Sequence, residues 1–137
     1  ITKDMMNSEV GFCRKVLSAF EDNGVSIEHM PSGIDTMTVI VKQDAFQPKE
    51  QMILSAIQRS VKPDSIEIET DLALIAVVGR SMRAEAGISA KIFTSLANAN
   101  VNVKSLDQGS SELNVIIGVN NKDFEAAIKA IYNAFVK

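Results

Sequence analysis

Two short stretches near the start of the chain carry the residue types best suited to binding chemistry. Asn7 to Phe12 precedes a predicted helix, where free backbone N–H groups attract a carboxylate and Gly11 lets a ligand approach closely. Across from it, a predicted strand and turn carry Glu28, Ser32, Gly33 and Asp35, whose carboxylates and carbonyls suit an ammonium group. Donors at one end and acids at the other match a free amino acid. The simpler alternative, open on spacing alone, is that Asn7 and Ser8 cap the helix and the acids are solvated.

Catalytic and metal-binding motifs are not recognisable in the sequence. His29 has no nucleophile placed beside it by motif, and an isolated histidine in a strand is more often structural. Cys13 falls on the first turn of a helix, where a thiol pKa can drop, but among apolar neighbours we expect it to be buried and inert. The chain has no CxxC, HExxH, EF-hand or glycine-rich phosphate motif. We therefore expect no active site, no metal and no cofactor in this chain.

Composition narrows the class of protein further. Hydrophobic residues make up 46% of the 137 residues, charged residues 23%, and the formal net charge is −3. Such a balance disfavours broad affinity for nucleic acid or an acidic membrane, and no apolar run approaches the ~20 residues of a membrane span. The strands also lack the exposed aromatics of RNA-recognition modules. One cysteine, which cannot form an internal disulfide, fits a reducing cytoplasm.

The elements that must position these residues occur twice. Gly11–Val41 and Gly87–Ile117 align without a gap at an offset of 76 residues, matching Gly11 with Gly87 and Gly33 with Gly109. We expect helices at 9–22, 49–60, 87–98 and 122–135. Strands are expected at 1–6, 25–30, 37–41, 66–69, 74–79, 101–106 and 112–119, with a loop holding Phe46. Each copy reads as strand, helix, strand, strand, helix, and the first adds a closing strand.

The sequence thus predicts an α+β fold of two ferredoxin-like βαββαβ units in tandem, with antiparallel sheets and helices on one face. The first unit spans 1–70 and the second 71–137. The start at Ile1 and the lack of a last strand in the second unit suggest a piece of a longer protein.

Several segments together resemble the tandem ACT domains in the C-terminal regulatory region of bacterial aspartokinases. They are Met6–Phe12 with Arg14–Leu17, Glu28–Asp35, Leu74–Gly79 with Met82 and Gly87, and the turn Gln108–Glu112, which reads QGSSE. The resemblance covers essentially the whole chain and is specific as a set. It implies a small-molecule sensing module.

In that family the kinase phosphorylates L-aspartate with ATP, and the effector binds where the first ACT units of two subunits meet. The resemblance therefore implies a cytoplasmic homodimer that binds L-lysine, with L-threonine as a further candidate, and no nucleic acid or membrane. ATP and magnesium would belong to a kinase domain that this chain lacks, so we expect no kinase activity here. By resemblance the effector-binding residues are Met6, Asn7, Ser8, Gly11, Phe12, Cys13, Glu28, Ser32, Gly33 and Asp35.

A second effector site is implied in the second unit, although that unit could equally be structural. Lys104 stands where the first copy has Glu28, so the two sites should not be equivalent. Its candidate residues are Gly79, Gly87, Ile88, Ser89, Gln108, Gly109, Ser110 and Ser111.

The overall function indicated is feedback inhibition of aspartate phosphorylation. Two alternatives stay open at this point. The chain could be a dimerisation module that binds no ligand, or an ACT regulatory subunit of another amino-acid biosynthetic enzyme, such as one that binds valine.

Overall fold

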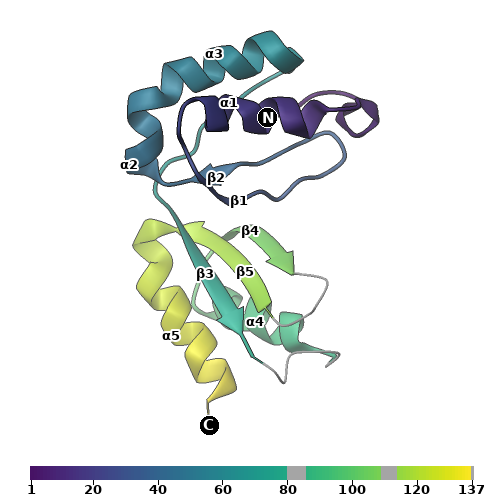
Figure 1. Cartoon of the computed structure of the whole chain (residues 1–137). Helices are drawn as coiled ribbons and strands as arrows, with labels where there is room; N and C mark the ends of the chain where they lie inside the picture. The colour runs from purple at the N-terminus through teal and green to yellow at the C-terminus, as the bar shows by residue number, and fades with distance from the viewer. Residues whose placement is uncertain (80–85, 109–113, 137) are drawn as a thin grey trace. The chain divides into compact units, whose positions relative to one another are not determined.

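The computed structural model describes residues 1–79, 86–108 and 114–136. The chain divides into two units, Ile1–Thr70 and Asp71–Lys137 (Figure 1). Each unit is built around its own hydrophobic cluster. Both units are α+β, with antiparallel strand pairing, so the predicted fold class is confirmed. Among the described residues, no helix combines the length and apolarity needed to cross a membrane.

The first unit consists of short strands and three α-helices. Its elements are η1 (Met6–Ser8), α1 (Phe12–Asp22), β1 (Ile27–His29), β2 (Ile40–Val41), α2 (Gln43–Phe46), η2 (Gln47–Lys49) and α3 (Glu50–Val61).

The extended segment at Thr2 lies between two other extended segments of the first unit. It forms antiparallel bridges with Thr36 on one side and Ser65 on the other. Ser32 bridges Met37, and β1 pairs with β2, so the second extended segment lies beyond the third. The spatial order is therefore fourth, first, third, second, as in a ferredoxin-like fold. The predicted closing strand at 66–69 is misplaced, because the pairing involves Ser65 and residues 66–70 are in no strand.

The two long helices of the first unit pack side by side over its core (Figure 1). Helical spacing turns an apolar row of each helix toward the strands. The buried core residues come from α1, α3 and the segments around them: Met6, Phe12, Val16, Ala19, Phe20, Val25, Met37, Ile53, Ile57 and Val61.

The second unit repeats this plan with longer strands. Strand β5 lies between β3 and β4, which is again the order first, third, second. Alternate residues of β5, Val115, Ile117 and Val119, are buried against α4 and α5. Its elements are β3 (Leu72–Val78), α4 (Ile88–Asn98), β4 (Val103–Gln108), β5 (Asn114–Asn120), η4 (Asn121–Asp123) and α5 (Phe124–Phe135).

The sequence repeat is reproduced residue for residue in the helices. Helix α1 begins at Phe12 and α4 at Ile88, and the two have the same length of 11 residues. Gly11 and Gly87 precede them with φ of 81° and 91°, a left-handed conformation that glycine adopts without strain. In both copies the fourth helical residue donates its N–H to that glycine's carbonyl at 3.0 Å.

Some element boundaries differ from the expectations. Helix α1 begins at Phe12 rather than Glu9, since the left-handed turn at Gly11 interrupts the backbone spiral. Phe46, expected in a loop, lies in α2 and stacks on Phe20 with ring centroids 6.4 Å apart. Phe46 is partly buried and packs against the core of the first unit. This tertiary contact favours the helical segment and cannot be recognised from local sequence.

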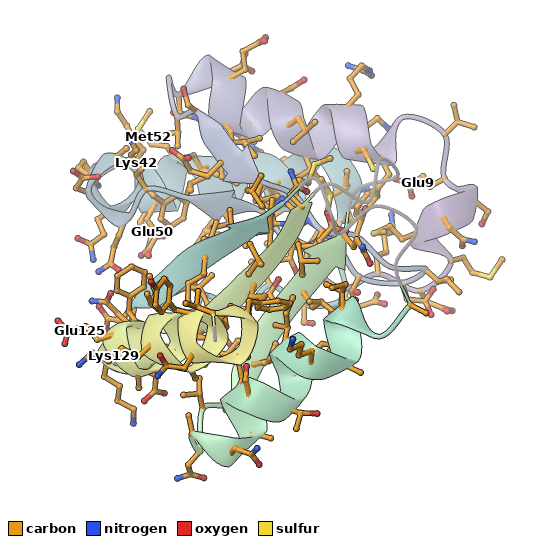
Figure 2. The ribbon with its side chains drawn as sticks, turned by 90° about the horizontal axis from the view of Figure 1, so that it is seen from below. Glu9, Lys42, Glu50, Met52, Glu125 and Lys129 are labelled. Carbon is orange, nitrogen blue, oxygen red and sulfur yellow. The ribbon has the colours of Figure 1, made fainter. Side chains whose placement is uncertain are left out.

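We expect the substitution Ile53→Ala to lower the free energy of unfolding of the first unit by ~2–5 kcal/mol, because it leaves a cavity in the core. Ile53 is 0% exposed, whereas its neighbour Met52 is 58% exposed (Figure 2). Met52→Ala is the matched control and should change stability by no more than about 0.5 kcal/mol. Urea unfolding followed by circular dichroism measures both, and equal losses would contradict this core.

Candidate functional site

The start of α1 offers backbone donors for an anionic group. The N–H groups of Phe12 and Lys15 donate to the carbonyls of Glu9 and Gly11, at 3.3 and 3.0 Å. Those of Cys13 and Arg14 lie between them and donate to no carbonyl among the described residues. Free N–H groups and the positive end of the helix dipole suit a carboxylate. These two N–H groups are available to an anionic partner, and their role in binding an effector stays a prediction.

Asn7 and Ser8 do not cap this helix, so that half of the simpler interpretation is wrong. Its other half agrees with the structure, because Glu28 and Asp35 are both exposed. Asn7 and Ser8 belong to η1, and the residue preceding α1 is Gly11, which has no side chain to cap with. The Ser8 hydroxyl instead donates to the Met5 carbonyl at 2.9 Å. This bond stabilises the left-handed turn at Met5, whose φ is 62°.

The turn at residues 33–35 lies against the segment that leads into α1. The Asn7 N–H donates to the Ile34 carbonyl at 3.2 Å, and the Met5 N–H to Asp35 Oδ1 at 3.3 Å. Gly33 closes the turn by donating to the Thr36 carbonyl at 2.7 Å. The structure thus brings Asn7, Gly33 and Asp35 together. One Asp35 oxygen accepts the hydrogen bond from the Met5 N–H, and the side chain is exposed to solvent.

Glu28 lies apart from this group within one chain. It sits in β1, five residues before Gly33, a distance of about 16 Å in extended chain. Its carboxylate lies 4.0 Å from the Lys42 ammonium. Figure 2 shows Lys42 on the opposite side of the first unit from Glu9, which precedes α1. A single copy of the first unit therefore does not assemble Glu28 and the helix start into one pocket.

Burial separates the remaining candidates of the first unit. The side chains of Met6 and Phe12 are 5% and 2% exposed and belong to the core, so only their backbone can face a ligand. Cys13 is exposed, contrary to the expectation of a buried thiol, because it points away from the apolar row of α1. Ser32 is also exposed, at the bridge to Met37.

In the second unit, Gly87, Ile88 and Ser89 form the start of α4, as Gly11 to Cys13 do for α1. Gly79 directly follows β3, and Gln108 is the last residue of β4 rather than part of a turn. Gly109, Ser110 and Ser111, with the rest of the predicted QGSSE turn, lie outside the described residues. No cluster of three or more His, Cys, Asp or Glu side chains fit for a metal occurs within the ranges that the structure describes.

Lys3 holds the segment that leads into α1 against the end of α3, a role that the sequence does not indicate. Its ammonium lies 2.6 Å from Glu9 Oε1 and also donates to the Val61 carbonyl at the end of α3. It stands 5.9 Å from the centre of the Phe12 ring. One cation thereby ties the start of α1 to the end of α3. Residues six and 58 positions away supply these partners, which is why local sequence could not reveal them.

Comparison with known proteins gives consistent results. A family model described as "ACT domain" matches residues 75–135. Aspartokinase 3 of Bacillus subtilis is 38% identical over 136 residues, covering 98% of this chain and 30% of that protein. The chain thus spans about a third of such a relative.

Solved structures show the same correspondence. The aspartate kinase of Clostridium acetobutylicum matches with a TM-score of 0.94 and 52% identity over 98% of this chain and 31% of that one. Two more distant structures share the fold. The regulatory subunit of aspartate kinase from Thermus thermophilus has a TM-score of 0.79 at 23% identity, over all of this chain and 88% of its own. Aspartokinase III of E. coli, in complex with lysine and aspartate, matches with a TM-score of 0.72 and 18% sequence identity. The match covers 98% of this chain and 30% of that one.

We expect Lys3→Met to lower the free energy of unfolding by ~1–3 kcal/mol, since it removes charge-assisted bonds from partly buried partners. Lys42→Met is the control, because the Lys42–Glu28 pair is long and its lysine side chain is 73% exposed. That variant should lose no more than ~0.5 kcal/mol. Chemical unfolding at low salt compares them, and a larger loss for Lys42→Met would refute the role given to Lys3.

Proposed function

Because this chain is homologous to the C-terminal regulatory region of aspartokinases, we propose that it senses an end-product amino acid. L-lysine is the main candidate effector, with L-threonine as a second. Binding would feed back on the phosphorylation of L-aspartate by a kinase domain of the same protein. ATP and magnesium would act in that kinase domain, and a cytoplasmic homodimer is part of the proposal.

The observation that carries the proposal is the start of α1. Two adjacent backbone N–H groups, of Cys13 and Arg14, follow a left-handed glycine and donate to no carbonyl among the described residues. The 33–35 turn is bonded to the segment before them. An amino-acid carboxylate matches the N–H groups, and the Asp35 carboxylate suits a ligand ammonium. The bound lysine of the E. coli aspartokinase III structure supports lysine as the first ligand to test.

The effector site is proposed to need two copies of the chain. Glu28 projects from β1, far from the helix start of its own unit, so its carboxylate can reach a ligand there only from a partner. In a symmetric dimer the same patch of each copy meets the other, which creates two equivalent composite sites. Each site would take its N–H donors from one copy and Glu28 from the other. The resemblance to aspartokinases, which places the effector between first ACT units, supports this arrangement.

We predict that L-lysine gives a binding heat in isothermal calorimetry and that Glu28→Ala weakens this binding by ~10–100-fold, the cost of losing one charge-assisted hydrogen bond. Glu125→Ala, which removes an exposed acid from α5 (Figure 2), is the control and should bind as the parent does. L-valine should give no heat. If the parent chain gives no binding heat with lysine, threonine or valine, the chain is a dimerisation module and not a sensor.

We also predict that Cys13→Glu abolishes lysine binding, because its carboxylate would occupy the donors that the effector requires. The variant should fold at least as stably as the parent, since an acid at a helix start is favourable. Cys13→Gln, similar in size but uncharged, is the control.

Mixing the variants Cys13→Glu and Glu28→Ala tests the composite site. Half of the exchanged dimers would hold one copy of each, and one of their two sites would be intact. About a quarter of the parent's lysine sites should therefore return on mixing. If the mixture binds no lysine although the subunits exchange, the donors and Glu28 do not come from different copies.

A further inference from the structure

The guanidinium of Arg14 lies over the glycine that precedes α1. If Gly11 carried a Cβ, Arg14 Nη2 would be 3.9 Å from it and, chain neighbours apart, no other atom of the described residues would come within 4 Å. Helical side chains lean toward the N-terminus of their helix, and Arg14 is the third residue of α1, so its side chain can reach this position. The start of α1 therefore carries a charged side chain in addition to its backbone donors.

The space over Gly11 is where the side chain of a helix-capping residue would normally bind. Ser, Thr, Asp or Asn at this position accepts a hydrogen bond from the second or third N–H group of the helix. In α1 these N–H groups belong to Cys13 and Arg14, which donate to no carbonyl among the described residues. Gly11 has no side chain to accept them. A ligand carboxylate that accepted them would occupy the place of the missing cap, next to the guanidinium.

The second unit repeats the backbone of this helix start without the cation. Gly87 precedes α4 with a φ of 91°, close to the 81° of Gly11. A Cβ at Gly87 would meet no atom within 4 Å in the part of the chain that the structure describes. At the repeat offset of 76 residues, Arg14 corresponds to Ala90. The two helix starts therefore share their backbone conformation and differ in this guanidinium.

Local stability gives no reason for an arginine at this position. The first turn of a helix lies at the positive end of the helix dipole, where a cation is unfavourable. Within the described ranges, no acidic side chain lies within 4.0 Å of the Arg14 guanidinium to offset this cost. The Arg14 side chain is also exposed, so it contributes little to the core. A residue type that opposes its local structure often marks a functional position, and a bound anion would offset the cost.

We propose that the Arg14 guanidinium binds the carboxylate of the effector amino acid, together with the backbone N–H groups of Cys13 and Arg14. This inference rests on the proposed function, because it assigns a further residue to the same site. A guanidinium can donate two parallel N–H bonds to one carboxylate. Arg14 thereby makes the helix start of the first unit selective for ligands with a free carboxylate. The corresponding helix start of the second unit, with Ala90, lacks this contact.

A comparison of L-lysine with L-lysinamide tests this role, because lysinamide has an uncharged amide in place of the carboxylate. Isothermal calorimetry at about 0.15 M salt, where charges that are not in direct contact are screened, measures both affinities. The parent chain should bind L-lysine about tenfold or more tightly than L-lysinamide. Arg14→Ala, which installs the residue of the second copy, should weaken L-lysine binding about tenfold and should not weaken L-lysinamide binding. If only threonine gives heat, L-threonine and L-threoninamide replace this pair.

Two further variants separate a direct contact from a general effect of charge. Lys15→Gln removes a cation from the same turn of α1, and its counterpart Lys91 is retained in the second copy. This control should change the L-lysine affinity by less than about twofold, because a screened charge contributes little. Arg14→Lys keeps the charge without the two parallel donors, and it should recover part of the affinity that Arg14→Ala loses.

The outcomes separate this inference from the proposed function. If neither L-lysine nor L-threonine gives heat with the parent chain, the proposed function fails and the role of Arg14 fails with it. If L-lysine binds the parent and Arg14→Ala equally well, the role of Arg14 is overturned and the proposed function stands. Equal weakening of L-lysine and L-lysinamide by Arg14→Ala also overturns it, since the contact would not be with the carboxylate.

A thermal measurement distinguishes ligand binding from a structural role of Arg14. Without ligand, Arg14→Ala should melt no lower than the parent, because alanine favours the helix and removes an unfavourable cation from its first turn. At one fixed concentration of L-lysine, the parent should gain more thermal stability than Arg14→Ala does. A lower melting temperature of Arg14→Ala without ligand would mean that Arg14 stabilises the fold, and would overturn the inference.

Discussion

The first unit depends on one short extended segment that pairs on both sides. Thr2 bonds to Ser65 through its N–H and bridges Thr36 opposite, so the start of the chain lies in the middle of the sheet. The residues that follow therefore run alongside the 33–35 turn. The Met5 N–H donates to the Asp35 carboxylate and the Asn7 N–H to the Ile34 carbonyl. Helix α1 consequently begins beside that turn. Every candidate contact at the helix start follows from this central pairing.

Much of the fold could be predicted because it is encoded by spacing. The repeat at 76 residues places Gly11 and Gly87 at equivalent helix starts, and helical periodicity identifies the buried rows of α1 and α4. What could not be predicted depends on distant partners. Phe46 becomes helical through packing on Phe20, and Lys3 finds Val61 across the unit. Only part of the candidate site could be predicted. The sequence shows which residue types lie near a helix start, but it does not show at which end of the sheet Glu28 lies.

The separation of Glu28 from the helix start gives the proposed switch a physical basis. A ligand changes an equilibrium between arrangements only by its difference in affinity for them. A site completed by two copies exists only in the assembled form, so the effector favours that form. Coupling of ~1–3 kcal/mol between effector and kinase would change activity about 5–150-fold if activity follows the populations. An effector with micromolar to millimolar affinity binds with about 4–8 kcal/mol, which exceeds that coupling.

The most direct test of this account is sedimentation equilibrium of the chain at increasing L-lysine concentration. A ligand bound only by the dimer must strengthen dimerisation as its concentration rises, by mass action. We predict that the dimer dissociation constant falls steadily with lysine and does not change with valine. Two results would contradict the shared site. In the first, lysine binds but the dimer dissociation constant does not change; in the second, monomers bind lysine as tightly as dimers do.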